Sequence, residues 1–331
     1  MANRDKIALI LAGGQIIQKH VPIELETRVL EEEEIVALFP EAMREKIYIV
    51  DWSYQPISHY TLRMCSDMIQ VAGAQVEAGA SGIVITCGTQ ALTEMAYFSN
   101  LVWSYPQPLV FTASINYANS LGSETALFFS QSVRAAESRT CWGQGALVCL
   151  QDKLYPAAEL VHLSNDNRNG YVAIPGGPVA KFSEPEGVLT PIRTLRRGKI
   201  MDITTPPARN VEILDASLGG GDVLLNALLD GRVSEVDGLV VSSFGGGDVP
   251  PSWVSLLRKV MRAEVPVVLA SRCMAGRVIS GLDFEGSAKR LLEMGLISAG
   301  DLMPLQARIR LAVGLGAELR DQDLRSYMLN E

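Results

Sequence analysis

The chain has 331 residues, of which 48% are hydrophobic, 20% charged and 6% aromatic, and its formal net charge at pH 7 is −8. This length suggests two domains or one large α/β body, and the apolar fraction excludes extended disorder. The acidic balance, with no basic cluster beyond residues 193–199, argues against nucleic acid or an anionic membrane as a partner.

The first residues, MANRDKIALILAGG, pass from polar residues directly into a six-residue apolar run and a glycine pair. A secretory signal would have a longer apolar stretch and a small-residue cleavage site, so we interpret this start as a buried first strand. No apolar run approaches the roughly 18–20 residues of a membrane helix. We therefore expect a cytoplasmic protein.

Short apolar runs that end in small or hydroxyl residues alternate with helical patterns over the first 150 residues. Continuous apolar runs of this kind are typical of strands covered on both faces, as in a parallel sheet. The expected strands are residues 7–11, 47–50, 82–85, 108–111 and 146–150, and the expected helices are 31–39, 60–77 and 92–98. This alternation predicts an α/β fold with a doubly wound, mostly parallel sheet.

Six prolines between residues 170 and 209, together with Gly176 and Gly177, interrupt any long element, and we interpret this stretch as short strands and a linker. The alternation of expected strands and helices resumes with apolar runs at 211–214, 238–241 and 265–270. The pattern predicts a larger N-terminal domain (1–190) that carries the site, a linker (191–210) and a smaller C-terminal α/β domain (211–331).

Cysteine and histidine are sparse and carry no metal-binding spacing. The five cysteines lack a CxxC pair, and the three histidines lack HExxH. This pattern disfavours a disulfide framework and a zinc site. We expect neither a metal nor a cofactor.

Open α/β sheets bind ligands at the carboxyl ends of their strands, where the strand order reverses. This rule selects the loops at 13–16, 51–54, 86–90, 112–116, 244–250 and 271–276. In that order, these loops and their surroundings resemble the bacterial-type L-asparaginase and glutaminase family. The matching segments are LILAGGQI (9–16), GIVITCGTQALTEMAYF (82–98), PLVFTAS (108–114), SFGGGDVP (243–250), VPVVLASRCMAGRV (265–278) and GLISAGDLMPLQARIRLAVGLG (295–316).

The resemblance implies a larger N-terminal and a smaller C-terminal domain, and a homodimer or homotetramer. It also implies an active site at the carboxyl ends of N-terminal strands, completed by a neighbouring subunit. Such sites use two threonines and no metal. The first threonine attacks a side-chain amide carbon, and the second belongs to a proton relay with an aspartate and a lysine.

The first half of this chemistry is replaced in the present chain. Gln15 stands where the attacking threonine is expected, and a carboxamide has no nucleophilic oxygen of useful basicity. The preceding signature threonine is Ala12, and the segment 17–28 lacks the tyrosine that the family carries on a mobile loop. The second threonine is kept as Thr89, but its aspartate neighbour is Gln90, which cannot pair with an ammonium charge.

Other positions change as well. The relay lysine corresponds to His162, and the serine that grips the substrate carboxylate corresponds to Trp52, or to Ser53 in a register shifted by one. Cys87 replaces a histidine, and Asp248 replaces an asparagine. The candidate catalytic residues are therefore Thr89 and His162, and the candidate substrate-binding residues are Gln15, Trp52, Ser53, Gln90, Gly14, Gly88 and Asp248.

Several of these positions also have a purely structural interpretation. Thr89 can serve as a helix N-cap, Cys87 as a small buried filler, His162 as a surface residue, Asp248 as a cap of the turn that follows it and Trp52 as part of the core. Tight turns after strands would explain the glycines Gly13, Gly14, Gly245 and Gly247.

The chain keeps the motifs of the family's scaffold but has other residues at the positions of the site, which suggests a different ligand or reaction. The first hypothesis is a divergent enzyme acting on an amino-acid-derived or amide-containing small molecule, by hydrolysis through Thr89 or by a non-hydrolytic step. The second is a non-catalytic metabolite-binding or regulatory protein, and the third is residual asparaginase activity. An amidotransferase component acting on charged tRNA is disfavoured by the acidic balance. We expect a small-molecule substrate, self-association, and no nucleic-acid or membrane partner.

Overall fold

The apolar runs of the first 150 residues form the parallel part of an eight-stranded sheet. The computed structural model describes residues 5–21, 26–183 and 187–330. Strands run in the order β4-β1-β5-β6-β7, and all residues of the four strands inside the β4 edge are buried. The strands are β1 (Ile7–Leu11), β4 (Ile47–Asp51), β5 (Gly82–Thr86), β6 (Leu109–Thr112) and β7 (Ala146–Leu150).

An antiparallel extension completes this sheet, with β8, β11 and β12 following β7 in that order. Two short antiparallel pairs, β2–β3 and β9–β10, lie outside it. The elements are β2 (Gln18–Val21), β3 (Glu26–Val29), β8 (Lys153–Pro156), β9 (Leu160–His162), β10 (Tyr171–Ala173), β11 (Ala180–Ser183) and β12 (Val188–Pro191). Residues 192–210 contain no helix or strand.

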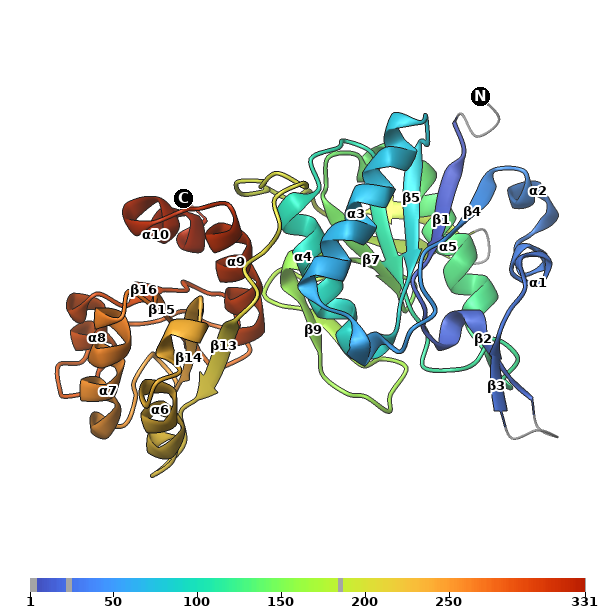
Figure 1. Cartoon of the computed structure of the whole chain (residues 1–331). Coiled ribbons are helices and arrows are strands. Elements are labelled where there is room, and N and C mark those ends of the chain that lie inside the picture. The colour runs from blue at the N-terminus through green and yellow to red at the C-terminus, as the bar shows by residue number, and fades with distance from the viewer. Residues whose placement is uncertain (1–4, 22–25, 184–186, 331) are drawn as a thin grey trace. The chain divides into compact units, whose positions relative to one another are not determined.

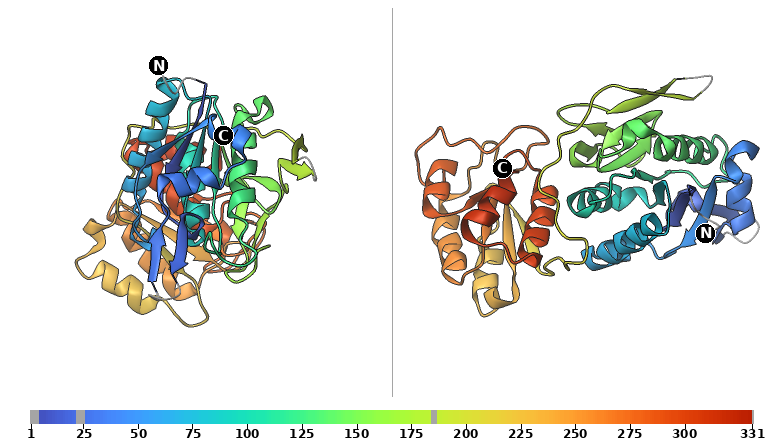
Figure 2. Two further views of the ribbon diagram at one scale, coloured as in Figure 1. Left: turned by 90° about the vertical axis from the view of Figure 1, so that its right-hand side faces the viewer. Right: turned by 90° about the horizontal axis from the view of Figure 1, so that it is seen from above.

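Helices cover both faces of the sheet: α3 and α4 pack together on one face, and α5 packs on the other (Figures 1 and 2). Phe129 of α5 stacks on Phe39, which follows α1, with ring centroids 5.2 Å apart. The crossovers β5–α4–β6 and β6–α5–β7 advance in the same direction with helices on opposite faces, so one of them departs from the right-handed rule. The helices are α1 (Glu32–Ala37), α2 (Glu41–Arg44), α3 (Leu62–Glu77), α4 (Leu92–Val102) and α5 (Thr125–Glu137).

A half-buried guanidinium fixes the start of the 192–210 segment to this unit. Nη2 of Arg197 donates to the carbonyl oxygens of Asn100 and Trp103, each at 2.8 Å. These carbonyls lie at the C-terminal end of α4, where a cation is favoured by the unpaired backbone acceptors.

The chain divides into two compact units, Met1–Thr204 and Thr205–Glu331. The second unit is built on a four-stranded parallel sheet in the order β13-β14-β15-β16. Its elements are β13 (Val211–Asp215), α6 (Asp222–Leu229), β14 (Gly238–Ser243), α7 (Pro251–Arg262), β15 (Val267–Ser271), α8 (Ala288–Met294), β16 (Ile297–Ser298), α9 (Pro304–Gly316) and α10 (Asp321–Leu329). Trp253, Leu257 and Leu291 are buried in its core with residues of β14 and β15.

The predicted α/β class, with a large mostly parallel sheet and a smaller second sheet, is confirmed. Among the described residues, no helix is long and apolar enough to cross a bilayer.

Candidate functional site

The strand order reverses between β1 and β5. From β1 the chain passes to β4 on one side and then to β5 on the other. At such a reversal the ligand crevice of an open α/β sheet is expected at the carboxyl ends of the strands, here β1 and β5, and we call this region the crevice. The β2–β3 and β9–β10 pairs lie at this end of the sheet (Figure 1). The residues that follow β1 and β5 include Gln15 and Thr89, so the topology brings both to one place.

Gly14 allows the two loops to touch. Its φ is +92°, and a Cβ atom there would lie 2.2 Å from the carbonyl oxygen of Cys87. Any side chain would therefore collide with the β5 loop backbone. This close approach explains the glycine in structural terms, whether or not a ligand also contacts it.

Gln15 and Thr89 each begin a single 3₁₀ turn, η1 (Gln15–Ile17) and η3 (Thr89–Ala91), and both are half-buried. Gly88 and Ala91 are the N-cap residues of η3 and α4. The interpretation of Thr89 as a helix cap is therefore wrong, because the capping positions belong to its neighbours.

Gln90 is exposed, and its side chain lies back over Gly88. A Cβ on Gly88 would lie 2.8 Å from Oε1 of Gln90 and 2.9 Å from Cγ2 of Ile57 in the β4 loop. Because Gly88 has no side chain, the Gln90 side chain can lie over it.

The β4 loop is attached to β1 through its backbone. The N–H groups of Trp52 and Ser53 donate to the carbonyl oxygen of Leu11, at 3.2 and 3.1 Å. Both side chains are half-buried, and the indole Nε1 of Trp52 is buried without a hydrogen-bond partner. Trp52 and Ser53 therefore follow the strand next to β1, beside the loop that carries Gln15.

Sequence reasoning missed two tyrosines at this crevice. The hydroxyl of Tyr60 donates to the carbonyl oxygen of Ala12 at 3.1 Å, and burial raises its pKa while a hydrogen bond with Ser53 lowers it. The segment 17–28 lacks a tyrosine, but Tyr60 from the β4 loop reaches the first loop instead. Only the long sequence separation hid this contact, since Tyr60 lies 48 residues from Ala12.

The second missed tyrosine connects His162 with Thr89. The rings of His162 and Tyr171 stack with centroids 4.4 Å apart and planes 5° apart. The Tyr171 hydroxyl donates to the carbonyl oxygen of Thr89 at 2.8 Å, and burial raises the pKa of this phenol. His162 is half-buried and its Nε2 is buried without a partner, so it is not a plain surface residue.

The segment that corresponds to the family's mobile loop is an antiparallel ribbon, of which residues 22–25 lie outside the described part. The ribbon is fastened to the loop after β6. The Asn119 side chain accepts from the backbone N–H of His20 at 2.9 Å and donates to its carbonyl at 2.8 Å. Ala118 N–H also donates to the Gln18 carbonyl at 2.8 Å. These three hydrogen bonds attach β2 to the loop after β6.

Cys87 is fully buried, and burial raises the pKa of its thiol. It remains protonated at neutral pH, which supports the interpretation as a buried filler. Four of the five cysteines are buried, and Cys273 is exposed.

Asp248 lies in the second unit, after β14. Its Oδ1 accepts from the backbone N–H of Ala288, the first residue of α8, at 3.1 Å. This bond satisfies a backbone N–H at the start of α8, 40 residues further along the chain, and not one in the turn after Asp248 where a cap was expected.

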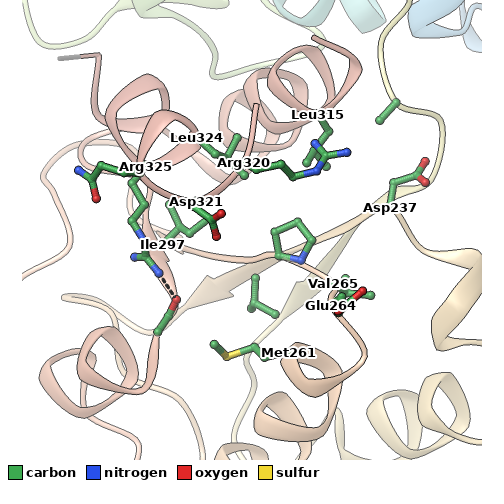
Figure 3. A pocket seen from close by; sticks show the side chains of 15 residues that line it. Asp237, Met261, Glu264, Val265, Ile297, Leu315, Arg320, Asp321, Leu324 and Arg325 are labelled. Atoms are coloured by element: carbon green, nitrogen blue, oxygen red, sulfur yellow. Dashed lines mark hydrogen bonds between the residues drawn. The ribbon is translucent and has the colours of Figure 1, made fainter. Parts of the chain in front are cut away.

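A hollow of about 930 Å³ occurs in the second unit, at the amino ends of its strands (Figure 3). Several of its polar groups are already used: Arg325 donates to the carbonyls of Gly295 and Leu296, and Asp237 accepts from two backbone N–H groups. We favour the crevice as the functional site, because ligands of open α/β sheets bind at carboxyl ends. Within the described residues, no group of three His, Cys, Asp or Glu side chains could hold a metal.

Comparisons with known proteins cover nearly the whole chain. Residues 6–191 match the family described as "Asparaginase, N-terminal", and residues 210–328 match "Glutaminase/Asparaginase C-terminal domain". An L-asparaginase of Bacillus licheniformis is 26% identical over 319 residues, which span 94% of this chain and 96% of that protein. A component of the glutamyl-tRNA(Gln) amidotransferase of Methanosarcina acetivorans is 26% identical over 98% of this chain and 77% of its own.

A solved structure of a probable cytoplasmic L-asparaginase from Campylobacter jejuni superposes with a TM-score of 0.87 at 20% identity, covering 99% of this chain and 100% of that one. At this identity the likeness supports the fold, and the two family matches carry the assignment. The chain belongs to the asparaginase and glutaminase family.

Proposed function

We propose that this chain is a divergent enzyme of the family that acts on an amino-acid-derived or amide-containing small molecule, without the two-threonine route to asparagine hydrolysis. The observation that carries the proposal is Gln15 at the head of η1, in the crevice where a nucleophile is expected. A carboxamide cannot form an acyl-enzyme.

The crevice still has groups that handle protons. Thr89 supplies a hydroxyl, and His162 supplies an imidazole, a side chain that serves as general acid or base in many enzymes. Thr89 would act as nucleophile in amide or ester hydrolysis. In a non-hydrolytic step such as cyclisation, elimination or proton transfer, it would orient the substrate and donate a hydrogen bond. Gln15 favours the second route, in which no covalent intermediate forms.

The replacements also restrict the ligand. Gln90 hydrogen-bonds but cannot form an ion pair with an α-ammonium group, and Trp52 offers an apolar surface where a small hydroxyl residue is expected. We therefore propose a ligand that is larger than asparagine and has a masked or missing α-ammonium group.

A thermal-shift screen of amino acids, their amides, N-acylated forms and cyclic derivatives tests this proposal. We expect stabilisation by masked or cyclic compounds and none by free asparagine. For the hit, Thr89→Val keeps the side-chain shape but removes the hydroxyl, and it should abolish turnover while leaving the thermal midpoint nearly unchanged. Full activity in Thr89→Val would remove Thr89 from the mechanism.

Two other functions lead to different results in the same experiments. A metabolite-binding protein without catalysis would give a thermal shift but no product, with Thr89→Val altering only affinity. Residual asparaginase activity would give ammonia from asparagine, with the nucleophile supplied by a residue other than Gln15.

We also propose that the chain works as a homodimer or homotetramer. Exposed apolar side chains occur on α6 and on the loops that follow β13 and β15, and Arg272 joins these two loops by donating to the Ala216 carbonyl at 3.4 Å. Exposed apolar surface of this kind would be covered in an interface, and a second copy is the partner we favour. The side chains are Leu218, Val223, Leu224, Met274, Ile279, Leu282 and Phe284.

Light scattering at micromolar concentration should give a multiple of the chain mass of 35.9 kDa. A monomer under these conditions would contradict the proposed self-association.

A further inference from the structure

The geometry points to Tyr171 as a positioning residue that holds His162 and Thr89 in a defined mutual arrangement. This inference rests on the proposed function, in which Thr89 and His162 do the chemistry. It concerns a residue that does not itself need to touch the substrate.

Tyr171 contacts the two candidate catalytic residues through different parts of its side chain. Its ring stacks on His162 with a 5° angle between planes, and its hydroxyl donates to the Thr89 carbonyl oxygen at 2.8 Å. The two candidates are 73 positions apart in the chain and lie on β9 and η3. Tyr171 is thus a direct bridge between them.

The ring contact is set by strand register. Tyr171 lies directly opposite His162 in the β9–β10 ladder, so their side chains project from the same face of this pair. The ladder joins only three residues of each strand. In so short a pair, the cross-strand contact of the two rings is a main constraint on the imidazole orientation.

The hydroxyl contact is maintained by burial. Tyr171 is 5% exposed, and burial raises the pKa of its phenol, which therefore stays protonated at neutral pH. A backbone carbonyl accepts but cannot donate, so the single phenolic proton is committed to Thr89. The bond fixes the backbone of η3 from which the Thr89 hydroxyl projects.

Two substitutions separate these contacts. Tyr171→Phe keeps the ring and removes the hydroxyl, whereas Tyr171→Leu removes both. Tyr48→Phe is the control, because half-buried Tyr48 likewise donates one hydrogen bond through its hydroxyl, to Gln75 Oε1 at 3.1 Å. A general effect of losing a tyrosine hydroxyl would appear in the control as well.

Two measurements need no substrate. The chain has three histidines, so the imidazole carbon–proton signal of His162 can be assigned by its loss in His162→Gln. We expect this signal to keep its position in Tyr171→Phe and to move in Tyr171→Leu, where the ring current of the stacked phenol is lost. Amide hydrogen exchange in η3 should accelerate about tenfold in Tyr171→Phe and stay unchanged in the control.

A third measurement uses the substrate identified by the screen. We expect Tyr171→Phe to lower kcat about 10- to 100-fold with a small change in KM, because the reacting groups are misplaced and binding is not. The pH profile of kcat should shift in Tyr171→Leu but not in Tyr171→Phe. If Tyr171 had a merely structural role, both variants would lower the thermal midpoint, and the effects on kcat and on its pH profile would not differ between Tyr171→Phe and Tyr171→Leu.

The inference is overturned if the His162 signal is unmoved in Tyr171→Leu, or if η3 exchange in Tyr171→Phe equals that of Tyr48→Phe. It is also overturned if both variants keep the wild-type kcat and pH profile on a confirmed substrate. If both substrate-free results hold but no compound is turned over, the positioning role stands and the proposed catalysis fails.

Discussion

Replacing Gly14 with alanine should show how strongly the β1 and β5 loops depend on their close approach. The substitution has two costs. At φ +92° and ψ 156°, a region almost confined to glycine, an L-residue is strained by about 1–3 kcal/mol, and the new Cβ would lie 2.2 Å from the Cys87 carbonyl oxygen. Relieving that collision requires a backbone shift of about 1 Å, comparable to overpacking a core at about 1–3 kcal/mol. We expect Gly14→Ala to destabilise the larger unit by about 3 kcal/mol.

The neighbouring glycine provides a control for the conformational part alone. Gly13 has φ +88°, but a Cβ there would meet nothing closer than the Gln55 carbonyl oxygen, at 3.3 Å. Gly13→Ala should therefore cost about 1–2 kcal/mol.

Calorimetry distinguishes the two variants. For a unit of this size, about 1 kcal/mol corresponds to about 2–4 °C in the midpoint, so Gly14→Ala should melt about 6–12 °C below wild type and clearly below Gly13→Ala. Equal midpoints for the two variants would refute the proposed contact between the loops.

Three further predictions concern other parts of the chain. Arg197→Met should lower the free energy of unfolding in urea by about 2–3 kcal/mol, because two carbonyl oxygens at the end of α4 lose a charged donor. Arg196→Met, at an exposed position, should leave this free energy nearly unchanged. Equal effects of the two substitutions would contradict the anchoring role of Arg197. Under native conditions at pH 8 a thiol reagent should rapidly modify one cysteine, Cys273, because the other four are buried and burial raises the pKa of their thiols. Fast reaction of a second thiol would contradict this prediction and would show that a buried site opens. Hydrogen bonds from Lys19, from the Glu31 backbone and from Arg28 lower the pKa of Glu34 from 4.5 to about 2, so the stability that its carboxylate contributes is present above pH 4.5 and is lost as the pH falls towards 2. The urea midpoint of Glu34→Gln should therefore lie below that of wild type at pH 7 and approach it at pH 2. A difference that stays constant with pH would contradict this.

The sequence predicted the fold well because continuous apolar runs report directly on buried parallel strands. The runs at 7–11 and 146–150 coincide with β1 and β7, and the expected helix at 60–77 corresponds to α3. The antiparallel strands β8, β11 and β12 were less visible. Each of them has four residues and contains proline or polar side chains, and such short strands carry little periodic signal.

The candidate site was predictable only in part. The strand-end rule and the family motifs brought Gln15, Trp52 and Thr89 to neighbouring loops, but no local pattern marked Tyr60 or Tyr171. Tyr60 bonds a backbone carbonyl 48 residues away and Tyr171 one 82 residues away. A hydrogen bond to a backbone oxygen places no requirement on the identity of the accepting residue, so it leaves no motif in the sequence.

The central claim is that the crevice no longer supports asparagine hydrolysis through an acyl-enzyme. The direct measurement is ammonia release from L-asparagine and L-glutamine by the purified protein and by Gln15→Thr. We expect neither protein to approach about 1–1000 turnovers per second, since the threonine alone restores neither the carboxylate at Gln90 nor the lysine at His162. Release at such rates by the wild-type protein would contradict the claim.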